Sequence, residues 1–265
     1  MRSTTPLHLY PMPNSEVTAF STTRHGGCGS DTYAGFNCTP YVGDKPAVVK
    51  ANQELLCELL SIPTERLIVP YQTHSCNILT IDDTFRHLSA DARHAIMQEK
   101  DAVMTHVEGL CLCVSTADCI PILLYDATHK AIAAIHAGWR GTASKIAAKA
   151  VKKMEHEFGS KAENIRAAIG PCIGQCCFET HSDVPEAMLA AFGASAEAFI
   201  RMEGEKFHVD LKGLNALALR EMGVAEIDTA EDCTACAPHR FWSHRIVGGQ
   251  RGSLAAIIML KGENA

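Results

Sequence analysis

Two residues with reactive side chains, Cys119 and His136, lie at opposite ends of a pair of apolar runs. Residues 120–125 and 131–135 are rich in branched side chains, and a short polar segment joins them, which is typical of an antiparallel hairpin. Folding this hairpin about Thr128 brings Cys119 level with His136. Directly opposed residues on one face of a sheet have Cβ atoms about 4.5–5.5 Å apart. A thiolate and an imidazole at that separation can share a metal ion, or act as nucleophile and general base.

The residues around this pair favour an anionic or aromatic substrate. Asp118 precedes the thiol, and Trp139 and Arg140 follow the histidine at the expected start of a helix. A guanidinium grips phosphate through two hydrogen bonds, and helix starts attract anions. The alternative is purely structural, because cysteine is among the most buried residue types. A buried thiol and a hydrogen-bonded histidine in an ordinary hairpin account for the same pattern, and the residue types alone leave both interpretations open.

Two loops carry further candidates for a site. Arg24 precedes Gly26 and Gly27, whose backbone amides can approach an anion, although a simple turn is the ordinary interpretation of such a segment. His74 follows the short apolar run 67–69 and is flanked by polar residues. Taken alone, a histidine in that position is more often structural than functional.

Twelve cysteines are a high number for a chain of 265 residues. Residues 1–16 lack the apolar core of a signal peptide, so the disulfide framework of a small secreted protein is not expected. Cys111 and Cys113 alternate with apolar residues, which predicts a buried strand. Residues 170–179 form a tight loop with three thiols, and residues 233–236 form a C-x-x-C motif. No second C-x-x-C accompanies that motif, so metal binding by this pair in its own right is the lesser expectation.

The composition excludes several classes of protein. The apolar fraction of 47% and the charged fraction of 20% are those of a globular protein, and the formal charge of −6 argues against a nucleic-acid binder. No apolar run approaches the roughly 20 residues needed to span a bilayer, which argues against a membrane protein. We expect a cytoplasmic location, and, because no linker or repeat divides the chain, a single domain over residues 1–265.

Helical and strand patterns are mixed along the chain. Helices are predicted from Asp44–Pro46 towards Pro63, from 145 to a terminating Gly159, from Ser182 with Pro185 in the first turn, and from Asp210 to Gly223. Strands are predicted over 16–20, 67–69, 101–105, 111–115, 165–169 and 255–260, and residues 82–99 are expected to form a surface loop and helix. The mixture favours an α+β fold.

These segments occur in the order found in one family. The chain resembles the multicopper polyphenol oxidoreductase (laccase-like) family, whose members are also described as zinc-dependent purine nucleoside phosphorylases. The matching segments span nearly the whole chain and are Arg-His-Gly-Gly at 24–27, Gln-Thr-His at 72–74, Thr-Ala-Asp-Cys at 116–119, His-Ala-Gly-Trp-Arg-Gly at 136–141, Gly-Pro-Cys-Ile-Gly at 170–174, Cys-Thr at 233–234 and Ser-His-Arg at 243–245. The chain departs from the family at His244, where a tyrosine is usual, and at Arg251, which lies in Gln-Arg-Gly instead of a Gly-Arg pair.

The resemblance implies a layered α/β/β/α sandwich with mixed sheets, and a zinc ion bound by His74, Cys119 and His136. Three protein ligands and an open fourth position are the pattern of a catalytic zinc, and the open position could activate water or orient a substrate. Arg24 and Arg140 are the expected phosphate-binding residues, and Asp118 is the expected general acid. Gln72 and Arg245 are expected to bind substrate or phosphate.

The activity implied by the resemblance is that of a purine nucleoside enzyme. It covers phosphorolysis of adenosine, inosine, guanosine and methylthioadenosine, with phosphate as the second substrate, and deamination of adenosine. A zinc-activated water that attacks a purine carbon is the established chemistry of deaminases. The chain lacks the His-x-Glu motif of the cytidine-deaminase type, so its general acid must lie elsewhere.

Three alternatives stay open. The first is oxidation of phenols with copper, since two histidines and a cysteine suit that ion; however, laccases bind several coppers, often through His-x-His pairs, and the 13 histidines here include none. The second is a thiol hydrolase acting on peptidoglycan precursors, with Cys119 as nucleophile and His136 as base. Cys119 cannot readily be a zinc ligand and a free nucleophile together. The third is a zinc-stabilised scaffold without enzymatic activity.

Overall fold

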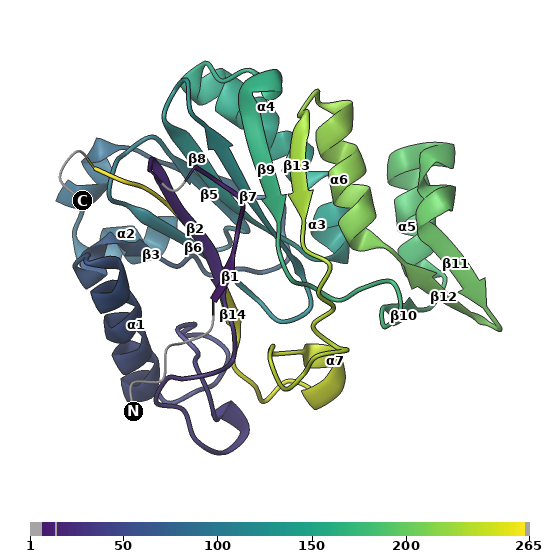
Figure 1. Ribbon diagram of the computed structural model, residues 1–265, viewed down its shortest axis with the longest axis horizontal. Coiled ribbons are helices and arrows are strands. Elements are labelled where there is room, and N and C mark those ends of the chain that lie inside the picture. The colour runs from purple at the N-terminus through teal and green to yellow at the C-terminus, as the bar shows by residue number, and fades with distance from the viewer. Residues whose placement is uncertain (1–6, 14, 263–265) are drawn as a thin grey trace.

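A computed structural model describes residues 7–13 and 15–262 of the chain (Figure 1). The first six residues, which belong to the segment used to judge a signal peptide, lie outside the described part. The helices of the described part are α1 (Pro46–Leu60), α2 (Ala90–Ile96), α3 (Trp139–Ala143), α4 (Ile146–Phe158), α5 (Asp183–Phe192), α6 (Leu211–Glu221) and α7 (His244–Val247). Within these ranges no helix combines the length and the apolar character needed to cross a bilayer.

The strands form two large sheets and a small one. The six-stranded sheet has the order β13 (Glu226–Thr229), β9 (Ile165–Ile169), β7 (Ile120–Asp126), β8 (Ala131–Ala137), β5 (Ala102–Thr105) and β4 (Ile78–Ile81). The five-stranded sheet has the order β1 (Leu7–Leu9), β2 (Val17–Thr22), β14 (Leu254–Leu260), β6 (Cys111–Thr116) and β3 (Leu67–Ile68). The small sheet has the order β10 (Glu179–Thr180), β12 (Lys206–Val209) and β11 (Ile200–Glu203), and it lies with α5 at one end of the molecule in Figure 1.

The two large sheets pack face to face through a shared apolar core. Successive residues of a strand point to opposite faces, so Leu123 and Tyr125 of β7 turn towards the five-stranded sheet, where they join Leu112 and Ile258 in one buried cluster. Both faces of β7 are buried, which explains why its sequence is a continuous apolar run instead of an alternating one.

Helices cover the outer face of each sheet. The helices α4 and α6 pack on the six-stranded sheet. Val151 of α4 and Leu214 of α6 belong to the same buried apolar cluster as Ile122 of β7. On the other side, α1 packs on the five-stranded sheet through Leu56. The result is the α/β/β/α sandwich predicted from the resemblance. Its sheets are mixed, because β4–β5, β3–β6 and β9–β13 pair in parallel and the other pairs are antiparallel.

The predicted helices are present, with one correction at a cap. Pro46 opens α1, Gly159 ends α4 with a φ of 72°, and the Asp210 side chain caps α6 by accepting a hydrogen bond from Gly213 N. Ser182 does precede α5, but its side chain makes no capping hydrogen bond, because its backbone is already helical (φ −66°, ψ −22°). Cys111 and Cys113 are buried on β6, as their alternation with apolar residues predicts.

The central hairpin is β7–β8, and its register differs from the prediction. Pro121 pairs with His136, and Ile120 pairs with Ala137, so Cys119 is not directly opposite His136. The cause is a four-residue turn after Asp126, which moves the fold point beyond Thr128. Continuing the register places Cys119 level with Gly138. Cys119 and His136 are therefore diagonal neighbours on the same side of the hairpin, which still keeps their side chains within reach.

Candidate metal centre and active site

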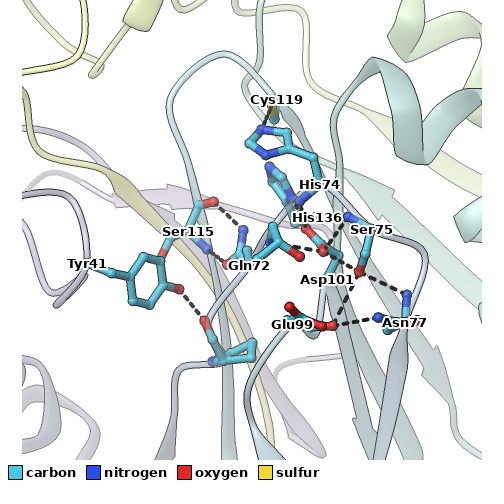
Figure 2. Close-up of polar contacts among 12 residues, drawn as sticks. Tyr41, Gln72, His74, Ser75, Asn77, Glu99, Asp101, Ser115, Cys119 and His136 are labelled. Atoms are coloured by element: carbon cyan, nitrogen blue, oxygen red, sulfur yellow. Dashed lines mark hydrogen bonds and ion pairs between the residues drawn. The ribbon is translucent and has the colours of Figure 1, made fainter.

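Three metal-ligand side chains converge at one end of the central hairpin (Figure 2). His74 comes from the loop after β3, Cys119 from the turn before β7, and His136 from the end of β8. Their candidate ligand atoms all lie within 4.8 Å of one another, and His74 Nε2 is 3.7 Å from Cys119 Sγ. The two imidazole rings meet edge to face with centroids 4.9 Å apart. The structure thus brings together the three ligands predicted from the sequence into a group that can hold a metal ion.

Asp101, for which no role was predicted from the sequence, orients this group. Its carboxylate is fully buried and accepts a hydrogen bond from His136 Nδ1 at 2.8 Å, which leaves the other ring nitrogen of His136 for the centre. The same carboxylate accepts the backbone N–H groups of Thr73, His74 and Ser75, and the Ser75 hydroxyl (Figure 2). A signal was present in the sequence, since Asp101 directly precedes the apolar residues 102–104 of a strand, where an isolated carboxylate would be costly without partners.

These partners keep Asp101 ionised. Burial by itself would raise the pKa of the carboxyl group, but the hydrogen bonds from His136 and Ser75 outweigh it and hold the pKa at about 2. An ionised carboxylate behind a metal-binding histidine fixes the tautomer and the orientation of the ring.

Two residues of the site, the candidate ligand His74 and the neighbour of Cys119, Asp118, have a positive φ angle. His74 has a φ of 61° and Asp118 a φ of 94°, which side chains with a Cβ rarely adopt. Asp118 is held there by its own carboxylate, which accepts hydrogen bonds from Thr234 Oγ1 at 2.6 Å and from Arg245 N at 2.7 Å. Backbone strain that the surrounding structure enforces in this way is characteristic of functional sites.

Because Gly138 has no side chain, it leaves space for the side chains of His74 and Cys119. A Cβ atom at this position would lie 2.8 Å from His74 Cδ2 and 3.2 Å from Cys119 Sγ. Any larger residue would therefore push these two side chains apart. This close approach gives a physical reason for the glycine that follows His136 in the His-Ala-Gly-Trp-Arg-Gly segment.

The thiol and the imidazole of the centre shift each other's pKa in opposite directions. Burial opposes both charges, yet the neighbouring His136 lowers the pKa of Cys119 to about 6. The Cys119 thiolate and the Asp101 carboxylate in turn raise the pKa of His136 to about 9. At pH 7 the pair therefore holds one proton, shared as thiolate and imidazolium. The thiolate is the form of cysteine that binds metals and attacks electrophiles.

Two cavities meet at the centre and share His74, Asp118 and Cys119 in their walls. The larger has a volume of about 380 Å³, and its wall also includes Gln72, His136, His244, Arg245 and Arg251. The smaller has a volume of about 280 Å³, and its wall also includes Trp139 and Arg140.

The residues predicted to bind substrate or phosphate differ in whether their side chains already form hydrogen bonds within the protein. Arg140 stacks on Trp139, with its guanidinium carbon 4.2 Å from the ring centroid, and faces the smaller cavity. Arg245 lines the larger cavity, but its guanidinium donates to the backbone carbonyls of Cys177 and Glu179. The Gln72 amide is likewise engaged, because it both donates to and accepts from the backbone of Ser115 (Figure 2).

Arg24 lies away from the two cavity walls. Its guanidinium stacks on Trp242 at 4.1 Å and donates to the Pro238 carbonyl at 2.7 Å. His244 and Arg251, for which no substrate-binding or catalytic role was predicted, do line the larger cavity. Arg251 is a half-buried side chain whose Nε has no hydrogen-bond partner among the described residues, and burial lowers the pKa of its guanidinium.

The fold and the centre together define an α+β sandwich protein with a His-Cys-His group that can hold a metal ion. The chain belongs to the family described as multi-copper polyphenol oxidoreductase laccase, which matches residues 18–261. It is 41% identical to a purine nucleoside phosphorylase of Bacteroides thetaiotaomicron over 93% of this chain and 92% of that protein. It is 38% identical to adenosine deaminase RL5, from an unknown prokaryotic organism, over 89% of this chain and 91% of that protein. Among solved structures, YlmD from Geobacillus stearothermophilus matches with a TM-score of 0.90 and 29% identity, over 99% and 98% of the two chains.

The substitution Asp101→Asn is expected to weaken metal binding at the His-Cys-His group by about 10–100-fold, the usual effect of losing a partner of a metal-binding histidine. Zinc competition against a chromophoric chelator measures the effect. Asp126→Asn is a matched control, because Asp126 is also fully buried and also lies 2.8 Å from a histidine Nδ1, that of His129 in the hairpin turn. Equal losses in both variants would show that Asp101 has no special role at the centre.

Metal binding at this group is expected to strengthen by about tenfold per pH unit between pH 6 and pH 9, because the ion displaces the single proton held by Cys119 and His136. Below about pH 6 the thiolate of Cys119 also becomes protonated, so the metal is lost more steeply. The same competition measurement, repeated across this range with the signal of His74→Ala protein subtracted, tests this. An affinity that does not change with pH would contradict the thiolate–imidazolium pair.

Proposed function

We propose that the chain is a zinc-dependent enzyme of purine nucleosides, which cleaves adenosine, inosine, guanosine or methylthioadenosine with phosphate and deaminates adenosine. The observation that carries the proposal is the convergence of His74, Cys119 and His136 at the junction of two cavities with arginines in their walls. Two adjoining cavities suit a reaction of a nucleoside with phosphate. The names of two close relatives, a purine nucleoside phosphorylase and an adenosine deaminase, support the same substrate class.

The chemistry of the donor set supports zinc as the metal. Imidazole nitrogen and thiolate sulfur are the usual ligands of zinc, and a His136 ring backed by the Asp101 carboxylate is a common arrangement around that ion. We assign His74, Cys119 and His136 as the three ligands. When bound there, zinc supplies Lewis acidity where the two cavities meet.

We place phosphate in the smaller cavity, beside Arg140. The guanidinium of Arg140 stacks on Trp139 and forms no ion pair with a described residue, so its N–H groups are available to grip an anion. The nucleoside then occupies the larger cavity, whose volume of about 380 Å³ lies in the range of small-molecule sites. The half-buried Arg251 also lines this larger cavity.

We assign proton transfer to His244 and a positioning role to Asp118. The imidazole of His244 lines the larger cavity and can give a proton to a departing purine or take one from an attacking oxygen. Asp118 faces both cavities, but each of its carboxylate oxygens already accepts a hydrogen bond, from Thr234 or from the backbone of Arg245. It therefore holds the turn that carries Cys119 instead of serving as the general acid expected from the sequence.

The thiolate character of Cys119 favours a second candidate function, a hydrolase in which Cys119 attacks the substrate and His136 acts as base. The lowered pKa of Cys119 next to an imidazole is the usual property of a cysteine nucleophile. In this case an electrophilic probe would label Cys119 equally well with and without zinc. Protection of Cys119 by zinc would instead support the role of a ligand.

Oxidation of phenols with copper is supported by the description of the family and by the two nitrogens and one sulfur of the centre. The centre offers ligands for one ion, however, and the described residues contain no further histidine pair beside it. We therefore propose phenol oxidation as a side activity of protein loaded with copper.

Zinc-loaded protein is expected to release the free base from inosine or adenosine only with phosphate, and to form inosine from adenosine without it. His74→Ala should lower both rates by more than about 100-fold, because loss of a ligand costs at least as much as loss of its supporting carboxylate. Chromatography of the products measures both reactions. His156→Ala is the control, since His156 is an exposed histidine on α4. Full activity of the His74→Ala protein would refute the proposal.

Arg140→Ala is expected to raise the KM for phosphate by roughly tenfold or more and to leave adenosine deamination unchanged. Hydrogen bonds to a charged group contribute about 1.5–3 kcal/mol, and each 1.4 kcal/mol corresponds to about tenfold. Initial rates at varied phosphate concentration measure the effect. Arg166→Ala serves as control, because Arg166 pairs with Glu226 on the surface of the sheet. Arg24→Ala tests the phosphate role expected from the sequence, and a larger KM effect for Arg24 than for Arg140 would reverse the assignment.

A further inference from the structure

Four cysteines from two separate loops gather outside the His-Cys-His group. One pair is adjacent in the loop after β9, and the other is the C-x-x-C motif near the C-terminus. Together they form the four-thiol cluster, which consists of Cys176, Cys177, Cys233 and Cys236. The chain contains no second C-x-x-C that could partner the first. The partner is a Cys-Cys pair, about 60 residues earlier in the chain, which the fold brings alongside.

The spacing of the sulfur atoms matches that of ligands around a single small ion. All four lie within 4.8 Å of one another, with 3.6 Å from Cys176 to Cys236, 3.4 Å from Cys177 to Cys236 and 3.7 Å between the adjacent pair. A tetrahedral zinc site with Zn–S bonds of about 2.3 Å places its sulfurs about 3.8 Å apart. None of the four is joined in a disulfide.

Hydrogen-bonded turns hold both halves of the cluster. The Cys177 and Phe178 N–H groups donate to the Gly174 carbonyl, and the Ala237 N–H donates to the Cys233 carbonyl, so each cysteine pair lies on a closed turn. A parallel bridge between Cys172 and Cys233 joins the two loops. Hydrogen bonds within and between the two loops therefore fix the backbone positions of the four cysteines, so each sulfur is only one side-chain torsion from the backbone.

The backbone also provides the hydrogen bond to sulfur that thiolates need. The Gly174 N–H donates to Cys233 Sγ at 3.2 Å. Although burial opposes the charge, N–H groups of Gly174 and Cys236 lower the pKa of the Cys233 thiol. A Cβ atom on Gly174 would lie 3.2 Å from Cys176 Sγ and 3.5 Å from Cys233 Sγ, so glycine leaves room for the sulfurs to meet.

We propose that the four-thiol cluster binds a structural zinc ion. Four sulfurs around one point favour zinc or iron, and four protein ligands close the site, as in structural zinc sites. An iron–sulfur cluster would need room for several ions between the cysteines, and the short sulfur separations leave none. On binding, each thiol that is still protonated releases its proton to solvent, and neither metal nor sulfur changes oxidation state.

The proposed ion would connect the two loops that carry the cysteine pairs, and both loops contact the walls of the nearby cavities. Ile173 and Phe178, next to the first cysteine pair, line both cavities, and Ile173 N donates to the Asp118 carbonyl. Thr234, inside the C-x-x-C motif, donates to the Asp118 carboxylate. Binding of zinc by the cluster therefore fixes the segments against which the turn of Cys119 rests, without supplying a reacting group.

Metal analysis of the purified full-length chain tests the proposal. After dialysis against trace zinc, we expect two zinc ions per chain, one in each cysteine-containing group. Cys236→Ser and Cys176→Ser should each retain one ion and unfold at a lower temperature than the unchanged protein. Cys28→Ser, which removes another exposed cysteine, should retain both and unfold at the unchanged temperature. Unaltered zinc content in both cluster variants, or iron in place of zinc, would overturn the proposal.

Alkylation of the unchanged protein tests the same site without a substitution. With zinc present, iodoacetamide should label Cys28 at once and spare the four-thiol cluster, and removal of zinc by a chelator should expose all four thiols. Peptide mapping by mass spectrometry identifies the labelled residues. Immediate labelling of the cluster in zinc-loaded protein, or a disulfide within it, would count against the proposal.

This inference is independent of the proposed enzymatic function. His74→Ala protein should lose the ion of the His-Cys-His group and keep the ion of the four-thiol cluster. Cobalt bound to that variant should give the intense visible bands of a tetrahedral tetrathiolate, and Cys236→Ser in the same background should abolish them. Absence of these bands would refute the structural site even if the enzyme is active, and their presence would support it even if no nucleoside is cleaved.

Discussion

The buried carboxylate of Asp101 is the interaction on which the centre depends. It receives the ring N–H of His136 from one strand end and three consecutive N–H groups from the loop of His74, so a single side chain sets the positions of two metal-ligand residues. A negative charge without these partners would be costly in a fully buried position. The carboxylate and the loop therefore require each other, and the loop adopts a left-handed backbone at His74 to meet this demand.

The layered fold explains why the centre lies where it does. The hairpin β7–β8 runs through the middle of the six-stranded sheet, with apolar partners on both faces. Between its two ends, the side chains of residues 120–124 and 132–135 are apolar and buried, which leaves no space for a ligand there. Chemistry is confined to its open end, where Cys119 precedes one strand and His136 nearly completes the other. The same end receives the loops after β3 and β9 and the C-terminal segment before β14, so residues far apart in the chain line common cavities.

The sequence predicts those parts of this arrangement that depend on local pattern or on the type of side chain. The helices α1, α4 and α6, the central hairpin and the choice of Cys119 and His136 as a candidate pair fall in this group, because periodicity, caps and donor chemistry can be recognised within a few residues. The inclusion of His74 as a third candidate ligand was implied only by the family resemblance. Features that depend on long-range geometry could not be predicted. A four-residue turn after Asp126 places His136 opposite Pro121, two residues from the expected Cys119, and nothing in the local pattern indicates that Asp101 meets the loop of His74 or that Cys176 meets Cys236. Arg24 and Gln72 show the converse. The charge beside a glycine loop suggested substrate contact for Arg24 and the family resemblance implied it for Gln72, while both side chains are engaged with the protein itself.

The place of β14 has a consequence for how the chain reaches its native state. This strand occurs late in the chain but lies between β2 and β6, with antiparallel partners on both sides. Until residues 254–260 leave the ribosome, β2 and β6 cannot be joined, and each presents an unpaired backbone edge of the kind that promotes aggregation. Formation of the five-stranded sheet is thus delayed until residues 254–260 have been synthesised, and its long-range pairings favour slow folding. A nascent chain that still lacks these residues must be kept from associating with its neighbours until β14 pairs with β2 and β6.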